Sequence, residues 1–144
     1  MIRPMQKTDC SVVARLWRND LNVPIATDES VRRTFEKMSE DSRYFTYVAE
    51  EDGIVVGFIT CVEVLSFDDP DDYIKINGIA VLPEYRRRGI GQQLTERAEQ
   101  DARHRGANSI GAATSLNRTG SQAMLNKFGY EKFAFWFHKK FSVK

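Results

Sequence analysis

The sequence predicts an α/β or α+β fold. Apolar residues recur with a period of two in some segments and near 3.6 in others, and the two periods alternate along the chain. The 144 residues, 42% of them hydrophobic, suffice for one core, and no linker, repeat or low-complexity segment divides them. We therefore expect a single domain over residues 1–144, with a mixed sheet of about six or seven strands flanked by about four helices.

The N-terminal part predicts a short strand and two helices. Residues 1–3 are expected to form the strand. Asp9 is expected to cap a helix that carries its apolar side chains on one face. A second helix is expected to begin at Asp28 or Ser30 and to end near Glu40.

The middle of the chain predicts antiparallel strands. Residues 44–50 and 54–65 are rich in β-forming residues, and the Asp-Gly pair between them favours a tight hairpin turn. The acidic stretch 67–72 is expected to be a loop, and residues 73–82 a strand. Gly78 interrupts that strand, which often marks a bulge or a close approach to the backbone.

The rest of the chain predicts a strand-helix-strand unit followed by a short helix and a last strand. From Gly89, apolar residues recur at helical spacing as far as Gly106, the expected end of the helix. Residues 108–114 are expected to return as a strand parallel to the preceding one. A helix at 119–128 and a long aromatic-rich strand at 130–141 complete the expected fold.

Net charge and hydropathy argue against some classes of binding partner. Twenty-one basic and twenty acidic residues give a net charge of +1, so no overall field favours nucleic acid or an anionic membrane. No apolar stretch approaches the roughly 20 residues of a membrane-spanning helix, and the N-terminus lacks a signal peptide's apolar segment. Cys10 and Cys61 are expected to be buried thiols, and no residue cluster predicts a metal site. We expect a soluble cytoplasmic protein.

The segment Arg86-Arg87-Arg88-Gly89-Ile90-Gly91 joins the end of a predicted strand to the start of a predicted helix. The free N–H groups and partial positive charge of a helix N-terminus suit a pyrophosphate, and glycine lets such a ligand approach the backbone. The three arginines add positive charge there. The alternative is that the glycines only allow a tight turn and that the arginines form a solvated corner.

Two common phosphate-binding motifs do not fit this segment. A P-loop has Lys and then Ser or Thr after its last glycine, but Gln92 follows Gly91. A Rossmann turn has Gly-x-Gly-x-x-Gly after the first strand of a larger parallel sheet. The segment therefore matches neither motif.

Three segments carry a resemblance to a known family. Ile2-Arg3-Pro4 followed by Asp9 is similar to its first strand and turn, and residues 79–91 resemble its main motif, Q/R-x-x-G-x-G/A after a strand. Asn117-Arg118 and Phe128-Gly129-Tyr130 resemble its later helix. In this order and at these separations, they resemble the GNAT superfamily of acetyl-CoA-dependent N-acetyltransferases across essentially the whole chain.

The resemblance implies a GNAT-like domain whose splayed strands form a slot for acetyl-CoA. Backbone amides from Arg86 to Gly91 would hold the pyrophosphate, and Asn117 would contact the cofactor from the other side. The pantetheine arm would pair with the backbone of Ile79, Ala80 and Val81. The implied reaction moves the acetyl group to a primary amine of a small molecule or peptide, and homodimers are common in this superfamily.

The chain differs from many members of this family at the positions that usually carry the proton donor and the general base. Leu125 stands where many members have Tyr, and the usual carboxylate positions hold Asn77 and Ala112. Asn77 can orient a water but cannot accept a proton at neutral pH. These departures keep open an alternative, a non-catalytic sensor that binds acyl-CoA.

Substitutes for the missing groups are Glu63, the acidic stretch 68–72 and Ser121. A water chain could relay the proton to one of these carboxylates, and Ser121 could donate a hydrogen bond near the thioester. The alternatives are solvated surface for the carboxylates and a bond to the helix backbone for Ser121. The acidic stretch also suggests a cationic acceptor.

Overall fold

The computed structural model describes residues 1–116 and 118–142, with residues 69 and 70 described by their backbone. The chain forms two compact units, Met1–Ala112 and Ala113–Lys144. The first unit holds all the described strands and every helix except the last.

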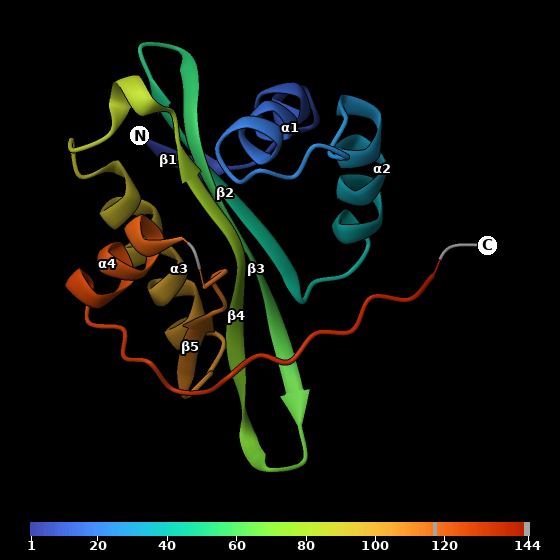
Figure 1. Cartoon of the computed structure of the whole chain (residues 1–144), viewed down its shortest axis with the longest axis vertical. Helices are drawn as coiled ribbons and strands as arrows, with labels where there is room; N and C mark the ends of the chain where they lie inside the picture. The colour runs from blue at the N-terminus through green and yellow to red at the C-terminus, as the bar shows by residue number, and fades with distance from the viewer. Residues whose placement is uncertain (117, 143–144) are drawn as a thin grey trace. The chain divides into compact units, whose positions relative to one another are not determined.

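Met1–Ala112 contains a five-stranded sheet in the order β1-β2-β3-β4-β5 (Figure 1). Strands β1 to β4 are antiparallel neighbours, and β5 is parallel to β4. The strands are β1 (Ile2–Pro4), β2 (Tyr44–Glu51), β3 (Ile54–Ser66), β4 (Asp69–Val81) and β5 (Ser109–Ala112). The mixed α/β architecture confirms the predicted fold class, although the sheet has fewer strands than expected.

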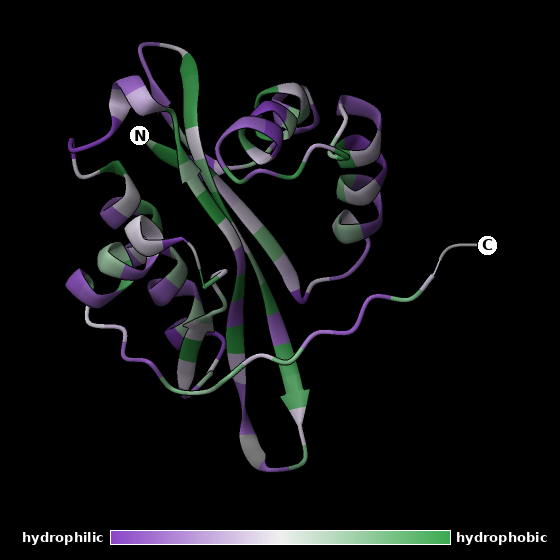
Figure 2. Ribbon diagram, viewed as in Figure 1, coloured by the Kyte–Doolittle hydropathy of each residue, from purple (hydrophilic) through white to green (hydrophobic). Residues whose placement is uncertain are grey.

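Helices α1 and α2 cover one face of this sheet, and α3 covers the other (Figure 1). The bounds are α1 (Cys10–Asn19), α2 (Asp28–Ser39) and α3 (Ile90–His104), with short 3₁₀ turns η1 (Lys7–Asp9) and η2 (Pro83–Tyr85). Alternating side chains of each strand serve the two faces: Phe58 packs with the α1 core, whereas Tyr47 bonds to Asp101 of α3. Figure 2 shows hydrophobic residues along the strands and polar residues over much of the helices.

A bulge in β4 changes which residues face α1. Thr60 pairs with Gly78 but the next residue, Cys61, pairs with Ile76, so Asn77 is the extra residue. The ring of Trp17 lies against Gly78, where a Cβ would come within 2.5 Å of the Trp17 Cζ2 atom. Both predicted reasons for a glycine at this position, a bulge and a close approach, are confirmed.

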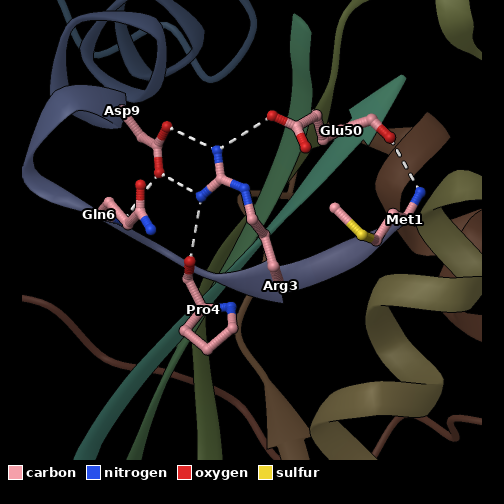
Figure 3. A network of polar contacts seen from close by, with 6 residues as sticks. All are labelled: Met1, Arg3, Pro4, Gln6, Asp9 and Glu50. Carbon is pink, nitrogen blue, oxygen red and sulfur yellow. Dashed lines mark hydrogen bonds and ion pairs between the residues drawn. The ribbon is translucent and has the colours of Figure 1, made fainter. Parts of the chain in front are cut away.

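Arg3 links β1 to β2 and to the start of α1 (Figure 3). Its guanidinium donates to both Asp9 carboxylate oxygens at 2.8 and 3.0 Å, and to Glu50 at 3.5 Å. Burial alone raises the pKa of Asp9, but hydrogen bonds from Arg3 and the Gln6 N–H hold this pKa below its ordinary value. Asp9 is at the N-cap of α1, as predicted, but its carboxylate fixes the preceding turn η1 and makes no cap bond to α1.

The acidic stretch 67–72 is a loop only in its first two residues. Ser66 pairs with Asp69, so β4 begins there and the turn is confined to residues 67–68. The prediction of a longer loop was wrong because β3 and β4 continue their ladder beyond the core. Side chains of that ribbon, such as Leu65, are exposed and follow no apolar pattern.

The described part of Ala113–Lys144 contains one helix, α4 (Thr119–Lys127). Gly129, with φ of 91°, ends it as predicted, and the Tyr130 N–H donates to the Leu125 carbonyl at 2.9 Å. Residues 130–142 form neither helix nor strand, so the predicted strand at 130–141 was wrong. A strand needs a hydrogen-bonded neighbour, and this unit has no other described strand to supply one.

Candidate functional site

Strand β4 loses one of its two neighbours at the bulge. Its pairing with β5 ends at Ile76, opposite Ala112. From Gly78 to Val81, β4 pairs only with β3 among the described strands. The other edge of this stretch, which includes the predicted pantetheine residues Ile79, Ala80 and Val81, offers backbone N–H and C=O groups to an extended ligand.

The turn that follows β4 has left-handed backbone at two positions. The φ angle is 64° at Arg87 and 79° at Gly89, the N-cap of α3. A backbone of this kind can direct successive N–H groups to one side, here beside the positive end of α3. A Cβ at Gly89 would meet nothing within 4 Å, so the space in front of this residue is open. The turn therefore fits an anion that approaches the backbone closely.

The three arginines of the turn have different surroundings. Arg86 donates to the Val81 carbonyl at 3.1 Å and to the Asp20 carboxylate at 2.9 Å, which ties the turn to the end of α1. The Arg88 guanidinium lies 5.0 Å from the centre of the Tyr85 ring. Arg87 has no hydrogen bond or ion pair among the described residues, so it is the free cation of the three.

Two residues fix the first turn of α3. Ile90 is buried, with 3% of its surface exposed, and anchors the start of the helix in the core. The buried Thr95 hydroxyl donates to the Gly91 carbonyl at 2.8 Å. The N–H groups at the helix start are therefore held on a rigid support.

A cavity of about 640 Å³ lies between α1, α2 and the sheet. The Thr46 and Thr60 hydroxyls, 2.8 Å apart, face it from the strands, and Asn77 lines it as well. Aromatic rings form much of its wall: Trp17, Phe35, Tyr44 and Phe58. Because Asn77 is the bulged residue of β4, the cavity reaches the place where the unpaired β4 edge begins.

Glu63 is placed away from Asn77. Its carboxylate accepts from the Arg105 guanidinium at 3.0 Å, at the C-cap of α3. It therefore belongs to the α3 face, whereas Thr60 and Asn77 line the cavity on the α1 and α2 face. Hydrogen bonds with Asp72 and Arg105 lower the pKa of Glu63, which weakens it as a base.

The other predicted site residues lie after β4 or outside the described residues. Ala112 ends β5, at the last pair with β4. Ser121 is in the first turn of α4, and Leu125 is near its end, where its carbonyl accepts from Tyr130. Asn117 lies outside the described residues.

Both cysteines are free and buried, as predicted. Burial raises the pKa of Cys61 to about 12, so its thiol is protonated at neutral pH. In residues 1–116 and 118–142 no three His, Cys, Asp or Glu side chains gather as a metal site would require. Within the same described residues, every helix is too short or too polar to cross a membrane.

Sequence reasoning missed the cavity and the link between Arg86 and Asp20. Trp17 and Phe35 lie on two different predicted helices, and nothing in their spacing indicated a shared cavity. One signal was available in Gly78, since a glycine within a strand can mark the approach of a large side chain.

Comparisons with known proteins identify the family. The acetyltransferase (GNAT) family model matches residues 12–130. An aminoglycoside N(6')-acetyltransferase type 1 of Salmonella enteritidis is 25% identical over 138 residues, which cover 91% of each chain. The L-amino acid N-acyltransferase MnaT of Escherichia coli strain K12 is 24% identical over 135 residues, covering 90% of this chain and 78% of the relative.

Solved structures give the same result for the fold. The aminoglycoside N-acetyltransferase AAC(6')-Iy in complex with CoA matches with a TM-score of 0.84 and 26% identity, over 97% of this chain and 93% of that one. Its complex with a bisubstrate analog, CoA-S-monomethyl-acetylneamine, matches with a TM-score of 0.83 and 25% identity, over 99% and 98% of the two chains. With the family match extending from α1 to just beyond α4, this chain belongs to the acetyltransferase (GNAT) family.

Proposed function

We propose that this chain transfers the acetyl group of acetyl-CoA to a primary amine. The observation that carries the proposal is that the unpaired β4 edge, at 77–81, leads directly into the left-handed turn at 86–91. The β4 backbone at 79–81 would pair with the pantetheine arm, and N–H groups of the turn would hold the pyrophosphate. AAC(6')-Iy, a structure of the same fold, was solved in complex with CoA, which supports CoA as the ligand.

The arginines of the turn would contribute in different ways. Arg86 and Arg88 are held by Asp20 and Tyr85, so they would contribute mainly their backbone amides. Arg87 would supply the side-chain charge that a phosphate attracts. Asn117 remains a predicted contact to the cofactor.

In the proposed reaction the neutral amine nitrogen attacks the thioester carbonyl directly. A carbon–nitrogen bond forms, the carbon–sulfur bond breaks, and CoA leaves as a thiolate that takes up a proton. Asn77, which lines the cavity beside the unpaired edge, would orient the water that removes the amine proton. Ser121 remains the proposed hydrogen-bond donor to the departing sulfur.

We propose solvent as the final acceptor of the amine proton. A relay to Glu63 would have to pass from the cavity to the α3 face, where Arg105 already binds this carboxylate. Because the pKa of Glu63 is lowered, it would hold a proton weakly at neutral pH. Glu63→Gln distinguishes the two proton routes, because it would change the pH profile of kcat only if Glu63 accepts the proton.

A non-catalytic acyl-CoA sensor is the second candidate function. It is favoured by Leu125 and Ala112, which stand where many members of the family carry a tyrosine and a carboxylate. Such a protein would bind acetyl-CoA without releasing CoA in the presence of amines.

Calorimetry with acetyl-CoA, combined with an assay of CoA thiol release over a panel of amines, tests the proposal. We expect binding and amine-dependent thiol release. Asn77→Ala should lower kcat by about tenfold or more while changing the acetyl-CoA Kd little, because general acid–base assistance acts on the chemical step. Asn19→Ala, an exposed change at the end of α1, is the matched control. Binding without thiol release for any amine would favour the sensor.

A further inference from the structure

The cavity between α1, α2 and the sheet has a wall suited to an apolar ligand. Phe35 and Met38 of α2 face it together with Trp17 of α1 and Phe58 of β3. The Trp17 and Phe58 rings lie 5.7 Å apart between centroids, in a tilted arrangement that leaves Trp17 half-buried. Aromatic and thioether side chains of this kind bind apolar and aromatic groups by contact area and by ring packing.

The charges of the cavity are unfavourable for a ligand with several positive charges. Its charged lining residues are Lys37 and Asp41, and both lie in the described part of the chain. Arg43 donates two hydrogen bonds to Asp41, at 3.1 and 2.8 Å, so this carboxylate is already neutralised. Lys37 is exposed and has no hydrogen bond or ion pair with any described residue. The uncompensated charge is therefore positive.

We infer that the acceptor is a primary amine with an aromatic or branched apolar body and no second cationic group, and that Lys37 favours an acceptor that also carries a carboxylate. An α-amino acid with a large apolar side chain has these properties. This inference rests on the proposed acetyl transfer and specifies its acceptor. It differs from the cationic acceptor suggested by the acidic residues 68–72, which are not among the residues that line the cavity.

The position of the cavity beside the unpaired β4 edge determines how a bound acceptor would be oriented toward the proposed acetyl-CoA site. Asn77 lines the cavity and stands at the start of that edge. An acceptor whose apolar body lies against Trp17 and Phe35 would present its amine toward Asn77. Its nitrogen would attack the acetyl carbonyl of acetyl-CoA, forming the amide and releasing CoA, while the proton leaves to water.

The test compares three amines with the whole chain: L-phenylalanine, phenethylamine, which lacks the carboxylate, and the polycation tobramycin. CoA thiol release gives kcat/KM for each amine. Calorimetry with the CoA-bound protein gives the affinity of each amine without turnover. We expect kcat/KM for each aromatic amine to exceed kcat/KM for tobramycin by about tenfold or more, with the same ranking in affinity.

Variants of Lys37 test the charge preference. Lys37→Gln should lower kcat/KM for L-phenylalanine by about two- to fivefold and leave phenethylamine unchanged, as expected for one partly exposed ion pair. Lys37→Glu should lower kcat/KM for L-phenylalanine further and raise kcat/KM for tobramycin. Arg33→Gln, which removes the same charge from the same helix outside the cavity, should change neither.

Two results would overturn the inference. A preference for tobramycin over both aromatic amines would overturn the proposed acceptor class while leaving acetyl transfer intact. Equal effects of Lys37→Gln and Arg33→Gln on kcat/KM for L-phenylalanine would overturn the role of Lys37. If acetyl-CoA binds but no amine releases thiol, the proposed reaction fails. The calorimetric ranking of the three amines then still decides which ligand the cavity prefers.

Discussion

The donor side and the acceptor side of this chain are built in different ways. Among the described residues, the proposed donor side is one continuous segment, residues 79–91, that presents backbone groups to its ligand. The cavity proposed for the acceptor gathers side chains from Met5 to Asn77, on α1, α2 and three strands. Recognition by backbone demands glycines at fixed positions, which can be seen in a sequence, whereas a cavity lined by dispersed side chains has no such spacing. Changes on the two sides should therefore affect different substrates.

The largest effect is expected on the donor side, at Gly89. Gly89→Asn keeps a residue type that tolerates positive φ, but its side chain fills the open space in front of the turn. Loss of one or two charge-assisted hydrogen bonds should weaken acetyl-CoA binding by about a hundredfold in calorimetry, with a native circular dichroism spectrum.

Gly106→Asn is the matched control for this change. Gly106 has φ of 81°, faces open space and lies just beyond the other end of α3. Its substitution should leave acetyl-CoA affinity unchanged. Equal acetyl-CoA affinities for the wild type and a folded Gly89→Asn variant would contradict the proposed role of the turn in cofactor binding.

A comparable effect, on stability instead of binding, is expected in the framework that supports both sides. Asp9→Asn removes the charge that Arg3 binds and should lower the free energy of unfolding at pH 7 by roughly 2–4 kcal/mol in urea denaturation. Because the folded pKa of Asp9 is lowered, its carboxylate stabilises the fold above its unfolded pKa of about 4. That contribution is lost as the pH falls through the folded pKa.

The difference between wild type and Asp9→Asn should therefore shrink as the solution is acidified. Asp28→Asn, which breaks the exposed pair with Arg18, should cost less than about 1 kcal/mol at any pH. A destabilisation by Asp9→Asn that does not change with pH would show that the ion pair is not its cause.

A smaller effect, confined to the acceptor side, is expected at Gly78. Gly78→Ala forces the Trp17 ring to move and should cost about 1–2 kcal/mol of stability. It should raise KM for the amine without changing the acetyl-CoA Kd. Gly111→Ala, on β5 with nothing within 4 Å of the added Cβ, is the control. If Gly78→Ala weakened acetyl-CoA binding instead, the two sides would not be separable.

The smallest effect is expected at Glu63. Glu63→Gln weakens a partly buried pair with Arg105 and should cost less than about 1 kcal/mol in thermal unfolding. The pH profile of kcat should be unchanged, since the carboxylate lies on the α3 face. A shift of the acidic limb of that profile would restore Glu63 as the base.

The sequence was most informative where backbone geometry constrains residue type. Gly78, Gly89, Gly106 and Gly129 were each expected at a bulge, a turn or a helix end, and the structure has them there. The tight hairpin turn expected at the Asp-Gly pair is found at residues 52–53, and both residues have positive φ.

The sequence was least informative where partners are distant in the chain. Asp9 has the pattern of a helix cap, but a bidentate bond from Arg3 engages its carboxylate. Arg86 was expected to add positive charge at the turn, but its side chain is paired with Asp20. The aromatic pattern at 130–141 suits a strand, yet a pattern cannot supply the neighbouring strand that a ladder requires.

The most direct test of the central claim is a single-turnover experiment with acetyl-CoA and L-phenylalanine, followed by mass spectrometry and a thiol assay. We expect equimolar N-acetyl-phenylalanine and free CoA, with Gly89→Asn needing a higher concentration of acetyl-CoA and Gly78→Ala a higher concentration of L-phenylalanine. Tight acetyl-CoA binding with no N-acetylated product from any amine would contradict it.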